Sequence, residues 1–280
     1  MLLREVEYAR PDSLEEALRI LGGNDGARAL AGGQTLVNVM KSRAASPDVL
    51  VDLGGLKELT AISTGPSGLE VGAMVTYAQL ASSSEVEVTR PILGEVAATI
   101  GDVQVRNRGT IGGNICSNDP TSHLPPLLVA LDARMTIAGP DGERTVGADD
   151  FFLGVYMTAV ATGELLTKVT VPPPGGAGDG FAALTIGADG TCIVNAAASV
   201  GDGGARVAIG CVSATPVRAT ELEAKLDGNL SEESVRAAAK GLGAQLEPPD
   251  DVHAGADYRR HLAEVMAVRA VLQAAERARG

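Results

Sequence analysis

Residues 29–43 read ALAGGQTLVNVMKSR, and residues 103–120 read VQVRNRGTIGGNICSNDP. Each segment carries a pair of adjacent glycines, Gly32-Gly33 in the first and Gly112-Gly113 in the second. The first pair follows a short apolar run and precedes a helix-like LVNVMK, which predicts a strand, a glycine turn and a helix. These two glycine loops are the features from which the fold and the function are best argued.

Glycine pairs remove side chains from positions where backbone N–H groups can then point at a bound anion. Gln34 and Thr35 after the first pair and Asn114 after the second add side-chain donors. One such turn would be weak evidence, since tight turns use glycine everywhere. Two loops of this kind that face each other could cradle a diphosphate, and they favour a dinucleotide ligand.

The usual nucleotide motifs are absent from the chain. Neither loop is a G-x-G-x-x-G after a first strand, and no G-x-x-x-x-G-K-[ST] occurs. A nicotinamide-type Rossmann fold and a P-loop therefore both lack their signatures. The nucleotide must be bound in another way.

Around the loops, the pattern predicts a mixed α+β fold. Ser13 with Glu16 three residues later predicts a capping box at the start of a helix. Residues 90–101 and 123–133 carry helical patterns, and Pro140-Asp141-Gly142 predicts a hairpin turn between two strands.

The segment 172–180, PPPGGAGDG, predicts a domain boundary because its three prolines and four glycines suit neither a helix nor a strand ladder. Beyond it, we expect a three-stranded antiparallel sheet with turns at Ala188-Asp189-Gly190 and at residues 201–204. A last helix over about residues 258–278 is expected to pack on that sheet; a partner-docking face is the alternative.

Composition limits the function. The chain has 280 residues, which favours two domains, and a net charge of -12 with a pI near 4.7, which argues against binding nucleic acid or an anionic membrane. The N-terminus lacks the apolar run of a signal peptide, and no stretch approaches the ~20 apolar residues of a membrane span. We expect a cytoplasmic protein without membrane insertion.

The three cysteines, Cys116, Cys192 and Cys211, lie far apart and form no C-x-x-C motif. They supply neither a zinc site nor a complete iron–sulfur ligand set, and we expect each to be a small buried apolar residue. With no Trp, three Phe and four Tyr, a ligand with large rings must be held mainly by backbone groups and aliphatic side chains.

The two glycine segments, together with the strand GELLTKVTVP at 163–172, closely resemble the FAD-binding medium subunit of the xanthine dehydrogenase and aerobic carbon monoxide dehydrogenase family. The resemblance spans essentially the whole chain. It implies a two-loop, PCMH-type FAD-binding domain over residues 1–175, with subdomains of about 1–55 and 56–175. Residues 176–280 correspond to the family's carbon monoxide dehydrogenase flavoprotein-like C-terminal domain.

The resemblance also implies cofactor-binding residues. Both glycine loops would hold the pyrophosphate, and single positions farther along the chain would lie near the adenine or flavin. The residues are Ala31, Gly32, Gly33, Gln34, Thr35, Leu36, Ile100, Thr110, Ile111, Gly112, Gly113, Asn114, Asp119, His123 and Leu166.

Two positions depart from the family pattern. His123 stands where the family commonly has an acid, and Ala183-Leu184 stand where a basic residue often follows the strand's Phe. His123 could hydrogen-bond the flavin or act only as a helix cap or partly exposed polar residue. Arg106, Arg108 and Lys41 could neutralise phosphate or simply lie on solvated surfaces.

The resemblance implies an electron relay. A large molybdenum-cofactor subunit oxidises the substrate, a small subunit with [2Fe-2S] clusters passes the electrons on, and the FAD of this chain hands them to an external acceptor. This chain would hold FAD only, with no metal and no catalytic acid, base or nucleophile, in a dimer of heterotrimers. The alternatives are a self-contained flavin oxidase of the same fold and a non-catalytic interaction domain whose glycine loops are only turns.

Overall fold

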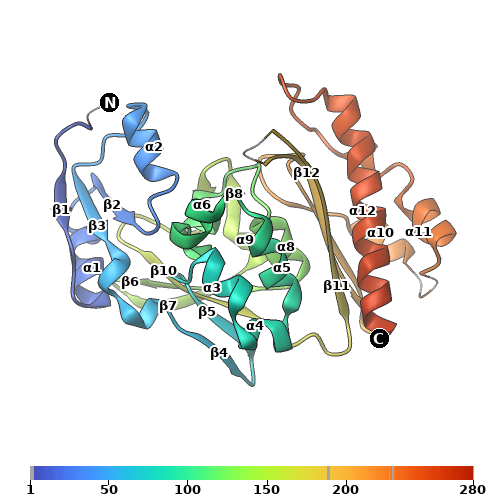
Figure 1. The fold of residues 1–280 in the computed structure, drawn as a ribbon, viewed down its shortest axis with the longest axis horizontal. Helices are drawn as coiled ribbons and strands as arrows, with labels where there is room; N and C mark the ends of the chain where they lie inside the picture. Colours follow the sequence, from blue (N-terminus) through green and yellow to red (C-terminus); the bar gives the residue numbers. More distant parts are fainter. Residues whose placement is uncertain (1–2, 188–189, 227, 229, 280) are drawn as a thin grey trace.

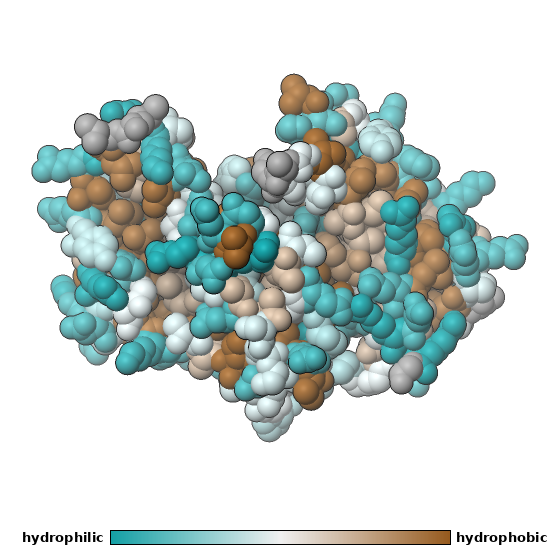
Figure 2. All heavy atoms as spheres, viewed as in Figure 1, coloured by the Kyte–Doolittle hydropathy of each residue, from teal (hydrophilic) through white to brown (hydrophobic). Residues whose placement is uncertain are grey.

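The computed structural model describes residues 3–187, 190–226, 228 and 230–279. The three larger sheets follow one another along the long axis of the molecule, in chain order from the N-terminal sheet through a central sheet to the C-terminal one (Figure 1). Seen from the same side, the surface is hollowed between the N-terminal part and the C-terminal helices (Figure 2). The α+β class and the two-loop architecture predicted from the sequence are confirmed. The expected turn at Ala188-Asp189-Gly190 falls largely outside the described residues.

The N-terminal sheet is parallel, with the strand order β1-β3-β2. Its elements are β1 (Glu7–Ala9), α1 (Leu14–Gly22), β2 (Ala27–Leu30), α2 (Leu36–Lys41) and β3 (Val49–Asp52). Ser13 caps α1 by accepting from the Glu16 N–H, as predicted, but the Glu16 carboxylate accepts from the N–H of Asp12 rather than from that of Ser13. The start of the helix is thus predicted correctly, but the second hydrogen bond of the capping box is made to the N–H of Asp12, one residue before Ser13.

The central sheet is antiparallel, with the order β4-β5-β10-β6-β7. A layer of short helices covers it and encloses the largest apolar core (Figure 1). The strands are β4 (Ile62–Gly65), β5 (Gly68–Gly72), β6 (Arg134–Gly139), β7 (Gly142–Gly147) and β10 (Leu165–Val171), and the helices are α3 (Tyr77–Ser82), α4 (Ser84–Thr89), α5 (Pro91–Thr99), α6 (Val103–Arg108), α7 (Ile111–Ser117), α8 (Leu124–Ala130) and α9 (Ala148–Phe151).

A small hairpin of β8 (Phe152–Gly154) and β9 (Met157–Thr158) lies against the end of α7. Asn118, in the left-handed region at φ 42°, donates its side-chain amide to the carbonyls of Gly154 and Met157. The hairpin is therefore fixed to the segment that follows the second glycine loop.

The C-terminal sheet has four strands rather than the three expected, in the order β11-β12-β13-β14. They are β11 (Gly178–Ile186), β12 (Thr191–Gly201), β13 (Gly204–Gly210) and the two-residue β14 (Val217–Arg218), followed by α10 (Thr220–Lys225), α11 (Glu232–Ala239) and α12 (Ala256–Arg279). The sequence pattern misses β14 because two residues give no alternation to detect. The last helix packs on this sheet as expected and buries Leu262 and Met266.

Part of the predicted linker 172–180 is a strand, which corrects the expectation that its glycines exclude a ladder. Gly178 and Gly180 begin β11, where α12 lies directly on the strand backbone. A Cβ at Gly178 would lie 2.1 Å from the Ala274 carbonyl oxygen, and one at Gly180 would lie 2.0 Å from that of Ala270. These glycines serve close packing of helix on strand rather than a turn.

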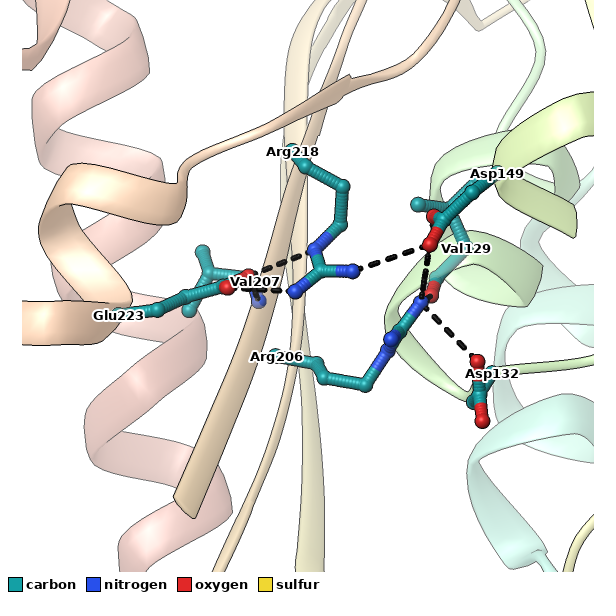
Figure 3. Close-up of polar contacts among 7 residues, drawn as sticks. All are labelled: Val129, Asp132, Asp149, Arg206, Val207, Arg218 and Glu223. Atoms are coloured by element: carbon teal, nitrogen blue, oxygen red, sulfur yellow. Dashed lines mark hydrogen bonds and ion pairs between the residues drawn. The ribbon is translucent and has the colours of Figure 1, made fainter.

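Ion pairs join the C-terminal sheet to the central part. Arg206 on β13 reaches Asp132, Asp149 and the carbonyl of Val129, while Arg218 on β14 bridges Asp149 and Glu223 (Figure 3). Asp149 therefore accepts from two arginines of the C-terminal sheet. Within the described part of the chain, no helix is both long and apolar enough to cross a membrane.

Candidate functional site

The two glycine loops touch each other. A Cβ at Gly32 would lie 2.0 Å from the carbonyl oxygen of Arg108, and one at Gly113 would lie 3.5 Å from the Cβ of Ala31. The first contact leaves no room for a side chain, so Gly32 permits the close approach of the two backbones. The fold thus brings together the two segments that the sequence singles out.

Free backbone donors gather on the first loop. Gly33 adopts φ +72°, which turns the chain sharply before α2. The N–H groups of residues 33–36 have no hydrogen-bond acceptor within the described part of the chain, whereas the N–H of Val37 is bonded to the Gly33 carbonyl. Unpaired N–H groups in sequence form a ready site for an anion.

The second loop uses its N–H groups internally, which differs from the expectation that both loops present donors. Ile111 and Gly112 donate to the carbonyls of Val75 and Ala73, and Gly113 donates to the Thr110 hydroxyl oxygen at 3.0 Å. A Cβ at Gly112 would lie 2.6 Å from the Ala73 carbonyl oxygen. This loop is anchored on the central sheet and forms a rigid wall beside the first.

A hollow of about 300 Å³ opens at the first loop. Its lining residues are Leu30, Gly32, Gly33, Gln34, Val37, Asn38, Lys41 and Arg108. Lys41 and Arg108 bring two cations to the free N–H groups in a chain whose net charge is -12. Arg106 instead donates to the carbonyls of Ile100 and Gly101, so it holds the turn before α6. The structure distinguishes among these three basic residues, which the sequence pattern cannot do.

Asn114 presents a buried polar atom without a partner. Its Oδ1 accepts no hydrogen bond from any described residue, while its Nδ2 lies 3.5 Å from the Ser122 hydroxyl. Burial raises the pKa of the neighbouring Tyr77 to about 12, and the hydrogen bond with Asn114 counteracts part of that rise. A buried carbonyl oxygen left free is costly unless a ligand or a water supplies the donor.

Asp119 lies just beyond α7, close to both the hairpin and Thr121. Its carboxylate accepts from the N–H and the hydroxyl of Thr121 and from the Tyr156 hydroxyl at 3.3 Å. Burial, followed by the charge and hydrogen bond of Asp119, raises the pKa of Tyr156. Tyr156 is a neighbour of this predicted residue that the sequence pattern does not reveal.

Three predicted residues lie away from the hollow. Ile100 caps the end of α5 and is partly buried against the central core, and Leu166 on β10 is buried in that core. His123 is also buried, with its ring 5.4 Å from that of Phe181 and Nδ1 3.4 Å from the Asn195 amide nitrogen. It makes no side-chain cap to α8, so neither the cap nor the partly exposed residue describes it.

Residues 4–174 match the family model for the FAD binding domain in molybdopterin dehydrogenase, and residues 181–274 match the CO dehydrogenase flavoprotein C-terminal domain. The chain is 36% identical to the glyceraldehyde dehydrogenase medium chain of Sulfolobus acidocaldarius, over 97% of this chain and 99% of the relative. It is 37% identical to the carbon monoxide dehydrogenase medium chain of Hydrogenophaga pseudoflava, over 97% of both chains.

The fold is also that of a solved oxidoreductase. A chain in the crystal structure of quinoline 2-oxidoreductase from Pseudomonas putida 86 superposes with a TM-score of 0.95 at 34% identity, and the match covers 99% of each chain. The likeness thus extends over nearly the whole chain and includes both glycine loops.

Proposed function

Because this chain belongs to the family of FAD-binding domains of molybdopterin dehydrogenases, we propose that it is the FAD-carrying electron-transfer subunit of a multi-subunit molybdenum hydroxylase. It is then an oxidoreductase subunit whose substrate is oxidised in another chain. The division into an FAD-binding domain over 1–175, with subdomains of about 1–55 and 56–175, and a C-terminal domain over 176–280 belongs to the same proposal.

The observation that carries the proposal is the row of free N–H groups over residues 33–36 on the first loop, of which Gly33 and Gln34 line the hollow together with Arg108 from the segment before the second loop. A diphosphate needs several donors and some positive charge, and here the donors are backbone groups with Lys41 and Arg108 beside them. A Cβ at Gly33 would lie 3.3 Å from both Leu30 and Val37, so only glycine leaves this turn both relaxed and open. The residues present therefore fit the group.

Six further predicted residues have a part in this proposal. Thr110 and Asn114 would complete the binding site from the second loop, since the Asn114 Oδ1 still needs a donor. Asp119 would hold polar atoms of the cofactor. Ile100, His123 and Leu166, which do not line the hollow at the first loop, would line the ring regions of the cofactor. Bound FAD supplies reversible electron transfer, while this chain binds it, orients it and controls access to it.

The partners follow from the same family. We propose a small subunit carrying [2Fe-2S] clusters as the electron donor and a large subunit carrying the molybdenum cofactor, assembled as a dimer of heterotrimers in the cytoplasm. Among the described residues, no group of three His, Cys, Asp or Glu side chains is arranged to hold a metal ion.

Two alternatives were open from the sequence. The two relatives described above, which this chain covers almost from end to end, are named medium chains of dehydrogenases, and this favours a subunit over a self-contained oxidase. An interaction module would need no free donors, and the unpaired N–H groups of the first loop argue against it.

The first experiment is the visible absorption spectrum of the purified chain, with the released cofactor identified after denaturation. We expect about one equivalent of FAD, bound as purified or after reconstitution beside the partner subunits. Gly33→Val should lose it, because the side chain crowds the first loop, and bulky replacements of Gly113 should act in the same way. Gly142→Val is the control: Gly142 also has a positive φ, 105° against 72° at Gly33, but no atom lies within 4 Å of its Cβ, so FAD should stay bound.

A chain that stays colourless even beside its partner subunits would overturn the proposal. Equal loss of FAD in the Gly33 and Gly142 variants would also contradict it, because backbone strain rather than crowding at the first loop would then be the cause.

A further inference from the structure

Two cysteines that are far apart in the sequence come together where the C-terminal sheet covers the start of α8. Cys192 on β12 and Cys211 just after β13 are 2% and 5% exposed. The Asn195 side-chain nitrogen lies 3.5 Å from each Sγ and 3.4 Å from Nδ1 of His123. One amide nitrogen therefore contacts both sulfur atoms and the imidazole, which places the two thiols on either side of the same group.

A β-bulge turns Cys192 into this cluster. Leu184 pairs with Val194 and Thr185 pairs with Cys192, which leaves Ile193 as the extra residue. Ile193 and Val194 both pack into the core under α12, so Cys192 points to the opposite face, which it shares with Asn195. Regular alternation would have put residues 192 and 195 on opposite faces.

Local backbone geometry also brings Cys211 into the cluster. It adopts φ +66°, a conformation that is uncommon for a residue other than glycine. The preceding Gly210 has no space for a side chain, since its Cβ would lie 2.3 Å from the Asn195 Oδ1. Unusual backbone conformations of this kind are often found at functional sites. Here the bulge positions Cys192 and the positive φ positions Cys211, so both features bring the same two thiols together.

Asn195 itself carries an unsatisfied atom. It is fully buried, its nitrogen also donates to the Ser122 carbonyl at 3.2 Å, and its Oδ1 has no partner among the described residues. An amide that is only half satisfied in a buried site costs stability. It does, however, hold a hydrogen-bond donor against both sulfurs, where negative charge would develop.

The electrostatics distinguish the two thiols. The hydrogen bond from Cys211, with smaller effects of His123 and Asn195, lowers the pKa of Cys192 against the opposing effect of burial. The hydrogen bond to Cys192, then burial, raises the pKa of Cys211. Cys192 is thus the nucleophile of the pair, because the thiolate is the reactive form. For Cys116, burial is the cause of the shift, and it raises the pKa of this thiol to about 12.

A narrow recess leads to Cys211. It is lined in part by Asp119, Ser122, Pro126 and Gly210, and its volume of about 10 Å³ corresponds to about one water-sized molecule. Cys211 lines this recess and Cys192 does not, so an oxidant that enters must be as small as a peroxide and must pass the Cys211 side chain to reach Cys192.

We propose that Cys192 and Cys211 are a redox-active dithiol that hydrogen peroxide oxidises to a disulfide. Cys192 attacks the peroxide: an S–O bond forms, the O–O bond breaks, and water leaves after protonation. Cys211 then attacks the sulfenic sulfur, so that an S–S bond forms, the S–O bond breaks and a second water leaves. Two thiols lose two electrons and two protons, and one peroxide becomes two waters. A soluble dithiol reverses the step.

The test is peptide mapping by mass spectrometry of the full chain under non-reducing conditions, after peroxide treatment and alkylation. We expect a linked pair of peptides that contain Cys192 and Cys211, separated again by dithiothreitol, while Cys116 stays free. In Cys211→Ser, peroxide should leave a sulfenic acid on Cys192 that dimedone traps. In Cys192→Ser, Cys211 should remain a thiol under the same conditions, and Cys116→Ala should behave like the wild type.

The peptide map of the wild-type chain tests the proposal by itself, even if a variant fails to fold. Three free thiols after treatment, or oxidation of Cys116 as fast as that of Cys192, would refute the proposal. Because the readout is a covalent linkage, it does not depend on whether the chain binds FAD.

Discussion

Arg90 and Asp179 form a buried ion pair that joins the end of α4 to the first strand of the C-terminal sheet. The Arg90 Nη1 lies 2.7 Å from both oxygens of the Asp179 carboxylate, and the two side chains are only 4% and 7% exposed. Arg90 also donates from Nε to the carbonyl of Pro172 at 3.0 Å. One guanidinium thus fixes both the end of the central part and the beginning of the C-terminal sheet.

Breaking this ion pair should destabilise the folded chain strongly. Asp179→Asn leaves the buried Arg90 charge without its counter-ion, and we expect a loss of about 3–5 kcal/mol in the free energy of unfolding. Urea unfolding measures it. The exposed pair of Arg236 and Glu232 is the control, since Glu232→Gln should cost about 0.5 kcal/mol or less. Equal, small effects of the two variants would mean that burial does not make the Arg90 pair important.

Gly180→Ala should destabilise the C-terminal part, because the new methyl group would lie 2.0 Å from the Ala270 carbonyl oxygen and push α12 off the sheet. Overpacking of this kind costs about 1–3 kcal/mol. Thermal unfolding checks it against Gly203→Ala in the turn between β12 and β13, where no atom lies within 4 Å of the added Cβ. If the two variants unfold at the same temperature, the helix is not as close to the strand as described.

Replacing either cation of the hollow should weaken FAD binding without abolishing it. Lys41 and Arg108 are exposed, so each is worth up to about 1 kcal/mol, or about fivefold in the dissociation constant. Titration of the flavin-free chain with FAD measures Lys41→Ala and Arg108→Ala, and added salt should narrow their difference from the wild type. Lys57→Ala, away from the hollow, should bind like the wild type. Unchanged affinity for FAD in both variants would mean that neither Lys41 nor Arg108 contributes to binding the cofactor.

Asp251 should contribute a pH-dependent part of the stability. Its carboxylate accepts from the N–H groups of His253 and Ala254 and from Arg259 at 2.7 Å, and these contacts lower its pKa to about 2, the His253 N–H first among them. Since the folded value lies below the unfolded one, the stabilisation is complete above about pH 4 and is lost as the pH falls toward 2.

The measurement for Asp251 is the urea midpoint of the wild type and of Asp251→Asn as a function of pH. The difference between them should be constant from pH 7 to about 5 and should shrink below about pH 4. A difference that grows on acidification would contradict the sign of this linkage.

Much of the fold could be predicted from local patterns. Ser13 was expected as a helix cap, and its side chain does accept from the N–H of Glu16, three residues on. The turn at Pro140-Asp141-Gly142 does join two antiparallel strands, β6 and β7. The errors arose where long-range packing decides, as at Gly180, whose strand conformation depends on a helix that begins about 76 residues later.

The sequence by itself determined the family, the two glycine loops and the absence of the usual nucleotide motifs, because glycine pairs, caps and periodicity act over a few residues. Only the tertiary structure decided which loop keeps its N–H groups free, that Lys41 and Arg108 but not Arg106 line the hollow, and that Cys192 meets Cys211. Each of these depends on which backbone atoms approach from a distant segment. Hydrogen-bond partners and thiol neighbours are properties of three-dimensional contact, which local sequence does not encode.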